Sequence, residues 1–287
     1  MEKTIQTTVV IGTLNRPNAV MSLIDQLVEE SKKIQLEIII IDQSTPENYK
    51  ELVTKFPKHI NFKLVHFDRP NTVKYLNYGW AQARSSIVLF LDDDVTLTKD
   101  TVQAHLNAYK DSSVKGVAGR VINDGEIITQ NNVVGKILWF GASFKKNFSY
   151  EKTTYVDFPY GCNMSFRKQV LKDLNGFDEK LSPPIYAFNE VDLGYQINKR
   201  WKNSILFSPE ALVYHRQFAR GGTRNDFEIK KVVNSNNYNY GYFLGKNFSI
   251  LENIICFIRR LPYQLIKEPK AILYIIKGFF YGKKTHV

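Results

Sequence analysis

Cysteine is scarce in this sequence, and long apolar runs are absent. The 287 residues contain two cysteines, Cys162 and Cys256, which lie far apart without the spacing of paired metal ligands. A disulfide-rich domain is therefore excluded, and a reducing compartment is expected. Nowhere does the run of roughly 18 apolar residues typical of a membrane-spanning helix occur, and residues 1–6 lack the apolar core of a signal peptide. We expect a cytoplasmic protein, free or peripheral on the inner face of the plasma membrane.

Positive charge is concentrated towards the C-terminal end. The net charge is +11, and residues 225–287 hold ten lysines and arginines against four acids. The apolar stretches 250–261 and 271–281 lie in this region and are interrupted or flanked by Lys and Arg. They are too short to cross a bilayer but suit its interface. We expect contact with an anionic membrane surface and no nucleic-acid partner, and a helical cap docked on the main domain is the alternative.

Buried strands alternate with helical segments through residues 7–92. Runs of β-branched and apolar residues predict strands at 7–13, 36–42, 61–67 and 86–92. Pro17 can begin a helix after the first strand, and a further helix is expected around 73–83. Because strands that alternate with helices are joined by right-handed crossovers, the pattern predicts an α/β fold with a mostly parallel sheet.

Three adjacent aspartates, Asp92, Asp93 and Asp94, end the fourth predicted strand. Neighbouring carboxylates repel one another unless positive charge lies among them. A Mg²⁺ or Mn²⁺ ion can supply that charge, since it binds one or two carboxylates and leaves other positions for substrate oxygens. The alternative is a solvated acidic turn.

Polar clusters also end the first two strands, at residues 13–16 and 42–44. In open α/β sheets ligands bind outside the carboxyl ends of the strands, so these clusters and the three aspartates are expected to share one crevice. There Asp42 can contact a ribose or a base, whereas the alternative is a turn or helix-capping role.

Seven motifs, taken in order, carry a family resemblance. They are 13–16 (Thr-Leu-Asn-Arg), 41–44 (Ile-Asp-Gln-Ser), Asn77, 90–94 (Phe-Leu-Asp-Asp-Asp), 160–167 (Tyr-Gly-Cys-Asn-Met-Ser-Phe-Arg), 176–179 (Gly-Phe-Asp-Glu) and 189–193 (Asn-Glu-Val-Asp-Leu). Over roughly residues 5–225 the chain resembles family 2 glycosyltransferases of the GT-A fold. The resemblance implies a nucleotide-sugar donor, a divalent metal and inversion at the anomeric carbon.

The resemblance assigns residues to the nucleotide. Thr13, Asn15 and Arg16 would line its pocket, and Asp42 would contact the nucleobase or ribose. Asn77, in the helix before the fourth strand, is a further donor-site candidate.

The resemblance also assigns the metal site. Asp94 would be the direct ligand of Mn²⁺ or Mg²⁺, and Asp92 would reach the ribose or a metal-bound water. Asp93 would only make the electrostatic potential of the site more negative. His215 ends a strand predicted at 211–216, where a histidine of related enzymes can complete the metal shell; a structural role is the alternative. Such a cation stabilises the charge that builds on the leaving diphosphate.

Inversion by single displacement needs one base to take the proton of the acceptor hydroxyl. The family's base is the Asp of a Glu-Asp pair, and here the pair reads Asn189-Glu190. We assign Glu190 as the base, with Asp192 as its main competitor. Gly161 and Asn163 would form part of the wall between donor and acceptor.

The loop 221–224 (Gly-Gly-Thr-Arg) combines flexible backbone with a guanidinium. Arg224 can therefore capture the diphosphate when the loop closes, and a plain surface turn is the alternative.

The sequence thus predicts a GT-A domain over residues 1–225 and a basic amphipathic helical extension over 226–287. The expected activity is metal-dependent transfer of a sugar, from a UDP- or dTDP-linked donor to a saccharide or lipid-linked saccharide, in surface polysaccharide synthesis. Two alternatives stay open: a catalytically silent nucleotide-sugar-binding protein, and a basic nucleic-acid-binding protein.

Overall fold

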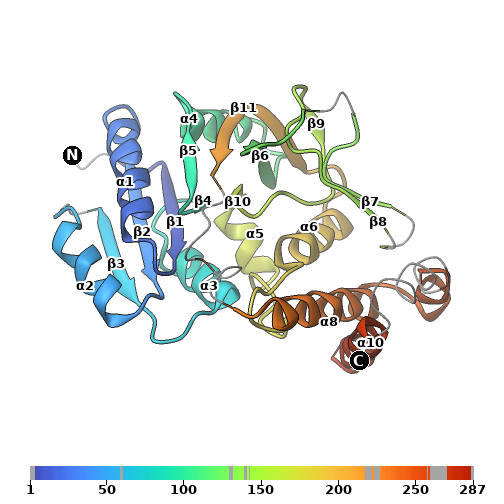
Figure 1. Cartoon of the computed structure of the whole chain (residues 1–287). Helices are drawn as coiled ribbons and strands as arrows, with labels where there is room; N and C mark the ends of the chain where they lie inside the picture. The colour runs from blue at the N-terminus through green and yellow to red at the C-terminus, as the bar shows by residue number, and fades with distance from the viewer. Residues whose placement is uncertain are drawn as a thin grey trace.

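The structure is a computed structural model that describes residues 4–58, 61–128, 132–138, 141, 143–216, 222, 227–256, 258 and 270–285. Helices flank a central nine-stranded sheet, and two long helices near the C-terminus extend away from it at one side (Figure 1).

Residues 7–92 form the parallel half of the sheet. Its elements are β1 (Thr7–Thr13), α1 (Pro17–Ser31), β2 (Leu36–Asp42), α2 (Pro46–Lys55), β3 (Phe62–His66), α3 (Thr72–Gln82) and β4 (Ile87–Asp92). Strand β1 lies between β2 and β4 and is parallel to both, and β3 pairs with β2. The four predicted strands and the helix that begins at Pro17 are confirmed. Every residue of β2 is buried, as expected for a strand covered on both faces.

The following residues add shorter elements. They are β5 (Val95–Leu97), α4 (Thr101–Ala108), β6 (Gly116–Asn123), β7 (Lys136–Leu138), β8 (Ser143–Lys145), β9 (Thr154–Tyr155), β10 (Asn163–Arg167), α5 (Lys168–Asp173), α6 (Asn189–Arg200) and β11 (Ile205–His215). Strands β7 and β8 pair only with each other.

The sheet order, β3-β2-β1-β4-β10-β6-β11-β5 with β9 beside β11, decides which residues meet. Strand β10 lies antiparallel between β4 and β6, which places Cys162 beside Asp92, the last residue of β4. Strand β11 ends against β5, where His215 pairs with Val95. The aspartates, Cys162 and His215 therefore lie at one edge of a sheet that is parallel in its first half and mixed in its second.

The C-terminal helices α8 (Ile229–Asn247) and α10 (Ala271–Lys284) pack side by side. Glycines form the contact: a Cβ on Gly241 would meet the backbone of Ile275, and one on Gly278 would meet the backbone of Tyr238. The other face of α8 packs aromatic rings on the main domain, with Phe243 stacked on Phe188 at a centroid distance of 5.8 Å. Among the described residues no helix is both long and apolar enough to span a bilayer.

Candidate active site

A cleft of about 570 Å³ opens where the carboxyl ends of β1 and β4 face the loop before β10 and the start of α6. Its walls contain Thr13, Arg16, Asp92, Asp93, Asp94, Gly161, Glu190 and His215, all of them residues that the sequence had singled out. Groups that are far apart in the sequence thus share one cavity, because β1 and β4 end beside the loop before β10 and the start of α6.

Asp93 and Asp94 are held by partners from the loop after β1. Thr13 Oγ1 donates to Asp93 Oδ2 at 2.6 Å. One nitrogen of Arg16, Nη1, donates to Asp93 Oδ1 at 3.0 Å and to Asp94 Oδ2 at 2.8 Å. All three charged side chains are largely buried. The guanidinium therefore offsets part of the repulsion between adjacent carboxylates and fixes one oxygen of Asp94.

The surroundings of these two carboxyl groups shift their pKa values in opposite directions. Burial raises the pKa of Asp93 from an ordinary 3.8 to about 7, against the attraction of Arg16 and with a further contribution from the charge of Asp94. Burial also acts to raise the pKa of Asp94, but hydrogen bonding and attraction from His215 and Arg16 outweigh it and hold that pKa below its usual value. Asp94 is thus the more firmly ionised of the pair.

His215 faces Asp94 with a defined ring nitrogen. Its Nδ1 lies 2.9 Å from Asn123 Oδ1, and the amide nitrogen of Asn123 donates to Glu126 Oε2 at 2.7 Å. Because that amide group presents its oxygen to the ring, Nδ1 carries a proton. Nε2 lies 3.1 Å from Asp94 Oδ1. The role of Asn123 was not predicted from the sequence, because no motif marks the residue that orients a histidine.

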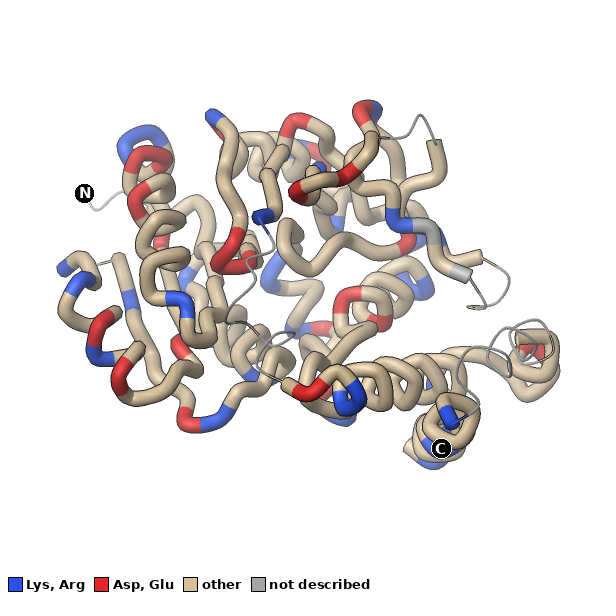
Figure 2. The backbone as a smooth tube through the Cα atoms, viewed as in Figure 1, with Lys and Arg blue, Asp and Glu red and all other residues tan. Residues whose placement is uncertain are grey.

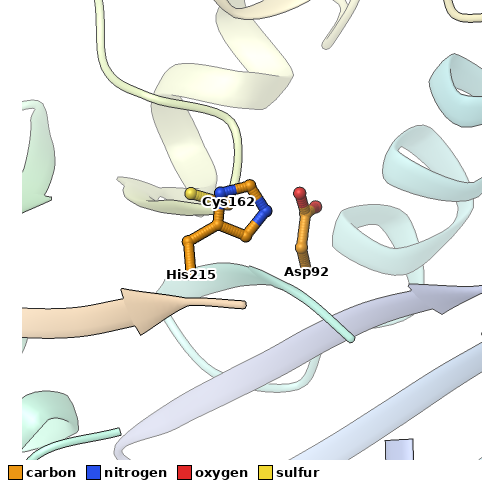
Figure 3. Close-up of side chains that lie close together, drawn as sticks. All are labelled: Asp92, Cys162 and His215. Carbon is orange, nitrogen blue, oxygen red and sulfur yellow. The ribbon is translucent and has the colours of Figure 1, made fainter. Parts of the chain in front are cut away.

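The facing atoms of Asp94 and His215 are suited to binding a divalent cation. Asp94 Oδ1 is buried and, among the described residues, has no well-formed hydrogen bond. Asp94 Oδ1 and His215 Nε2, two atoms of types that bind divalent cations, therefore face each other. Arg16 and Asn123 hold the opposite sides of the two groups, as outer partners commonly orient metal ligands. Asp92 offers an oxygen within 4.8 Å of a donor atom of His215, in a group whose third member is Cys162 and not Asp94 (Figure 3). Of the three residues predicted as cation ligands, His215 therefore lies near both Asp94 and Asp92.

Glu190 and Asp192 lie on different faces of α6, as residues two apart on a helix do. Glu190 lines the cleft, and within the described ranges no ion pair or side-chain hydrogen bond holds its carboxylate. Asp192 is buried away from the cleft, where Lys246 Nζ approaches its Oδ2 at 2.6 Å and Asn247 donates to its Oδ1 at 2.8 Å. The geometry thus favours Glu190 over Asp192 as the base.

Residues 8–174 match the family model described as glycosyl transferase family 2. The chain belongs to glycosyl transferase family 2. This confirms the family that the resemblance names, and five of the seven motifs lie within the matched residues.

Two curated proteins are similar to this family 2 chain. The glucosyl-dolichyl phosphate glucuronosyltransferase of Haloferax volcanii is 21% identical over 64% of this chain and 60% of its own length. The chondroitin synthase of Escherichia coli is 25% identical over 73% of this chain and 34% of its own length. The chain therefore spans less than two thirds of each of these relatives.

A solved structure confirms the fold. The crystal structure of GalNAc-T7 with UDP, GalNAc and Mn²⁺ superposes with a TM-score of 0.69 at 17% identity, covering 99% of this chain and 57% of that one. The α/β architecture is therefore the GT-A fold of glycosyltransferases, as predicted.

Two residues expected at the nucleotide do not line the cleft of this family 2 chain. The Asp42 carboxylate is buried and accepts hydrogen bonds from the backbone and hydroxyl of Ser44, while Nδ1 of His66 lies 3.0 Å away. Asn15 has a φ of 56° and turns its Oδ1 to the backbone nitrogen of Thr45, at 3.0 Å. Both order the turn between β2 and α2, which is the alternative that the sequence left open for Asp42. Gln43, the neighbour of Asp42, lines the cleft instead.

The side chains of two further candidates, Asn77 and Asn163, form hydrogen bonds outside the cleft. Asn77 binds both backbone groups of Phe177, its amide donating to the carbonyl oxygen and its Oδ1 accepting from the nitrogen, each at 2.9 Å. Asn163 is fully buried, donates to the carbonyl of Ala211 at 2.8 Å, and its Oδ1 lies 2.8 Å from Nε2 of His105. They anchor the walls of the cleft without lining it, because a side-chain amide also satisfies buried backbone groups.

Gly161 does line the cleft, and a Cβ there would meet open space. The predicted diphosphate-binding Arg224 lies outside the described residues, as do Gly221 and Thr223. Gly222 is described: its φ is +74°, its nitrogen donates to the carbonyl of Leu14 at 2.9 Å, and a Cβ there would press on the guanidinium of Arg16. This part of the loop therefore lies at the cleft beside the cation-site residues.

Proposed function

We propose that the protein is an inverting, metal-dependent glycosyltransferase. It transfers a sugar from a UDP- or dTDP-linked donor to a saccharide or lipid-linked saccharide in surface polysaccharide synthesis. The observation that carries the proposal is that Glu190 and the facing pair Asp94–His215 open into one cleft. The names of the two relatives, one acting on a sugar linked to dolichyl phosphate and one a chondroitin synthase, support this acceptor class.

The charged side chains of the cleft described above, together with Thr13 and His215, have parts in this reaction. Asp94, His215 and Asp92 would hold Mn²⁺ or Mg²⁺, which supplies Lewis-acid stabilisation of the departing diphosphate. Glu190 accepts the proton of the acceptor hydroxyl while that oxygen bonds to the anomeric carbon. The bond from that carbon to the diphosphate oxygen breaks in the same step, so the configuration inverts. Arg16 and Thr13 keep Asp93 and Asp94 in position throughout.

The direct test measures nucleoside diphosphate release from UDP-, GDP- and dTDP-sugars with Mn²⁺ present. We expect release with one donor class, and loss of at least two orders of magnitude of it in Glu190→Gln, since general-base catalysis contributes roughly that much. Binding of Mn²⁺ and nucleotide should survive the substitution. Glu47→Gln, at an exposed position on α2, is the matched control and should keep full activity.

Two results would count against the proposal. Equal release by wild type and Glu190→Gln removes Glu190 as the base. Nucleotide-sugar binding without release, for every donor and acceptor tried, favours the silent binding protein. Affinity for DNA or RNA that falls steeply with salt would instead support the nucleic-acid alternative.

The proposal includes a membrane surface as a partner. Among the described residues most of the exposed large apolar side chains fall in the last 60 or so positions, and we call the following set the apolar C-terminal face: Ile250, Leu251, Ile254, Ile255, Ile258, Leu273, Ile276 and Phe280. They recur at helical spacing, on the helical residues 250–256 and 258 and on α10. Lysines accompany them at the C-terminal end of α10 (Figure 2).

An anionic bilayer matches both properties of this face. Apolar side chains gain by leaving water, and each lysine near the surface adds about 1 kcal/mol of attraction to anionic lipid. We therefore propose that residues 226–287 form an extension that attaches the catalytic domain, 1–225, peripherally to a membrane that carries the acceptor. In this arrangement α8 docks on the domain while the apolar C-terminal face contacts lipid.

Vesicle co-sedimentation tests this attachment. The full chain should sediment with phosphatidylglycerol vesicles and weakly with phosphatidylcholine vesicles. The double variant Leu251→Ser, Phe280→Ser should lose most of that binding, whereas Val53→Ser, an exposed apolar position on α2, should not. Equal sedimentation of all three proteins would show that the face is not the attachment site.

A further inference from the structure

The cleft contains a thiol that the reaction proposed above does not use. Cys162 is 1% exposed and immediately precedes β10. The backbone nitrogen of Asp92 lies 3.4 Å from the carbonyl oxygen of Cys162, because β10 and β4 run antiparallel at this point. Figure 3 shows the sulfur of Cys162, the ring of His215 and the carboxylate of Asp92 gathered at one place, each from a different segment of the chain.

One donor atom from each of these three residues lies within 4.8 Å of the other two. Around Zn²⁺ a sulfur at about 2.3 Å and a nitrogen at about 2.0–2.1 Å stand roughly 3.5 Å apart in tetrahedral geometry. To share one ion, the three atoms would move from within 4.8 Å of one another to about that spacing by side-chain rotation. Because Nδ1 of His215 is hydrogen-bonded to Asn123, Nε2 is the ring atom that would bind the ion.

The identity of the donors decides which ions suit them. Mg²⁺ and Mn²⁺ favour oxygen ligands, whereas a thiolate favours Zn²⁺ and other thiophilic cations, with imidazole acceptable to both. A set of one thiolate, one imidazole and one carboxylate leaves a fourth tetrahedral position open, as in zinc sites that exchange ligands.

We propose that Cys162, His215 and Asp92 form a binding site for a thiophilic divalent cation such as Zn²⁺ or Co²⁺. The thiol releases its proton to solvent on binding, so that the ion is held by a thiolate. His215 has a single Nε2, and this site therefore competes with the Asp94–His215 pair for it. One consequence rests on the proposed function: Zn²⁺ bound here inhibits Mn²⁺-dependent transfer, because it occupies His215 and Asp92.

Cobalt gives a readout that does not depend on activity, since thiolate-bound Co²⁺ has a sulfur-to-metal charge-transfer absorption that oxygen- and nitrogen-bound Co²⁺ lacks. The full chain, without nucleotide, is titrated with CoCl₂ under reducing conditions. We expect the band to saturate at one Co²⁺ per chain and to disappear on addition of ZnCl₂. Cys162→Ser and Cys162→Ala should abolish it. Cys256→Ser, which removes the other buried thiol, should leave it unchanged.

Each outcome decides the proposal. Absence of the band in the wild-type chain overturns it, whether or not the variants fold, and so does a band that survives both substitutions of Cys162. Nucleotide release with Mn²⁺ is measured separately on the same preparations. A cobalt–thiolate band without release from any donor leaves this metal site standing and removes the proposed function, whereas release without the band does the reverse.

Discussion

Oδ1 of Asp94 lies 3.1 Å from Nε2 of His215, although Asp94 follows β4 and His215 ends β11. The pairing of β11 with β5 produces this proximity, since His215 pairs with Val95. Arg16 holds the other oxygen of Asp94, and Asn123 holds the other nitrogen of His215. The two remaining atoms are therefore directed at each other before any cation arrives, and four predictions start from contacts of this kind.

The first prediction concerns Asn123, which we expect to act through His215. Asn123→Leu removes the acceptor for Nδ1–H, so the ring loses its fixed orientation and tautomer. Loss of such an outer partner costs roughly 10–100-fold in metal affinity. Electron paramagnetic resonance of free Mn²⁺, in the presence of UDP, should show that loss. Asn107→Ala, at an exposed position on α4, should leave the affinity unchanged, and equal affinities for all three proteins would contradict the prediction.

The second prediction follows from the raised pKa of Asp93, which burial shifts from an ordinary 3.8 to about 7. Between these values the folded chain binds a proton that the unfolded chain has released, so its stability falls as pH rises from about 4 to about 7 and then levels off. Asp93→Asn cannot titrate and should lack this fall, which amounts to a few kcal/mol at 1.36 kcal/mol per unit.

Urea unfolding of both proteins with EDTA present, from pH 4 to pH 8, measures this difference. The quantity to compare is the gap between their unfolding free energies, because other groups titrate in both proteins. A gap that stays constant across this range would show that Asp93 keeps an ordinary pKa.

The third prediction concerns Lys246, whose Nζ lies 2.7 Å from Asp178 Oδ2 and 2.6 Å from Asp192 Oδ2. Lys246→Met would leave two largely buried carboxylates without their shared cation. Breaking a buried ion pair from one side costs about 3–5 kcal/mol of unfolding free energy. Lys277→Met, at an exposed position on α10, should change stability by less than about 0.5 kcal/mol. Equal unfolding midpoints in urea would mean that the network does not stabilise the fold.

The fourth prediction concerns the contact between α8 and α10. A Cβ at Gly241 would collide with the backbone of Ile275, so Gly241→Ala should separate the two helices. In an isolated helix the same change would stabilise by about 1 kcal/mol, which makes any destabilisation attributable to the contact. Limited proteolysis should cleave the variant near α10 earlier than wild type. Unchanged or slower cleavage would exclude this close packing.

The strand ends were the most predictable feature of the fold. Runs such as 36–42 are apolar on both faces, which leaves few alternatives to a buried parallel strand, and the structure places β2 over those residues. The positions of Asp92 and Asp94 at the cleft followed from the same reasoning, whereas that of His215 followed from the family resemblance. The extent of β11 did not, since a strand was predicted at 211–216 whereas β11 begins at Ile205 and has a register shift between Ser208 and Leu212.

Side-chain direction was less predictable than strand position. Asp42, Asn77 and Asn163 occur in motifs of the family, yet the structure turns each of them towards buried partners outside the cleft. Short polar side chains bind ligand and backbone with the same atoms, so the residue type cannot distinguish these uses. Asn123 and Cys162 show the converse, because nothing local in the sequence marks either of them as a neighbour of His215.

The amino-acid sequence by itself determined the strands, their carboxylate-rich ends and the family. Each of these depends on residues that are neighbours along the chain, where apolar periodicity and adjacent charge act directly. Only the tertiary structure decided that β10 inserts antiparallel beside β4 and that β11 ends against β5, because strand pairing joins segments through backbone groups that every residue carries. The environment of His215, with Asp94, Asn123 and Cys162 around it, is a product of that pairing.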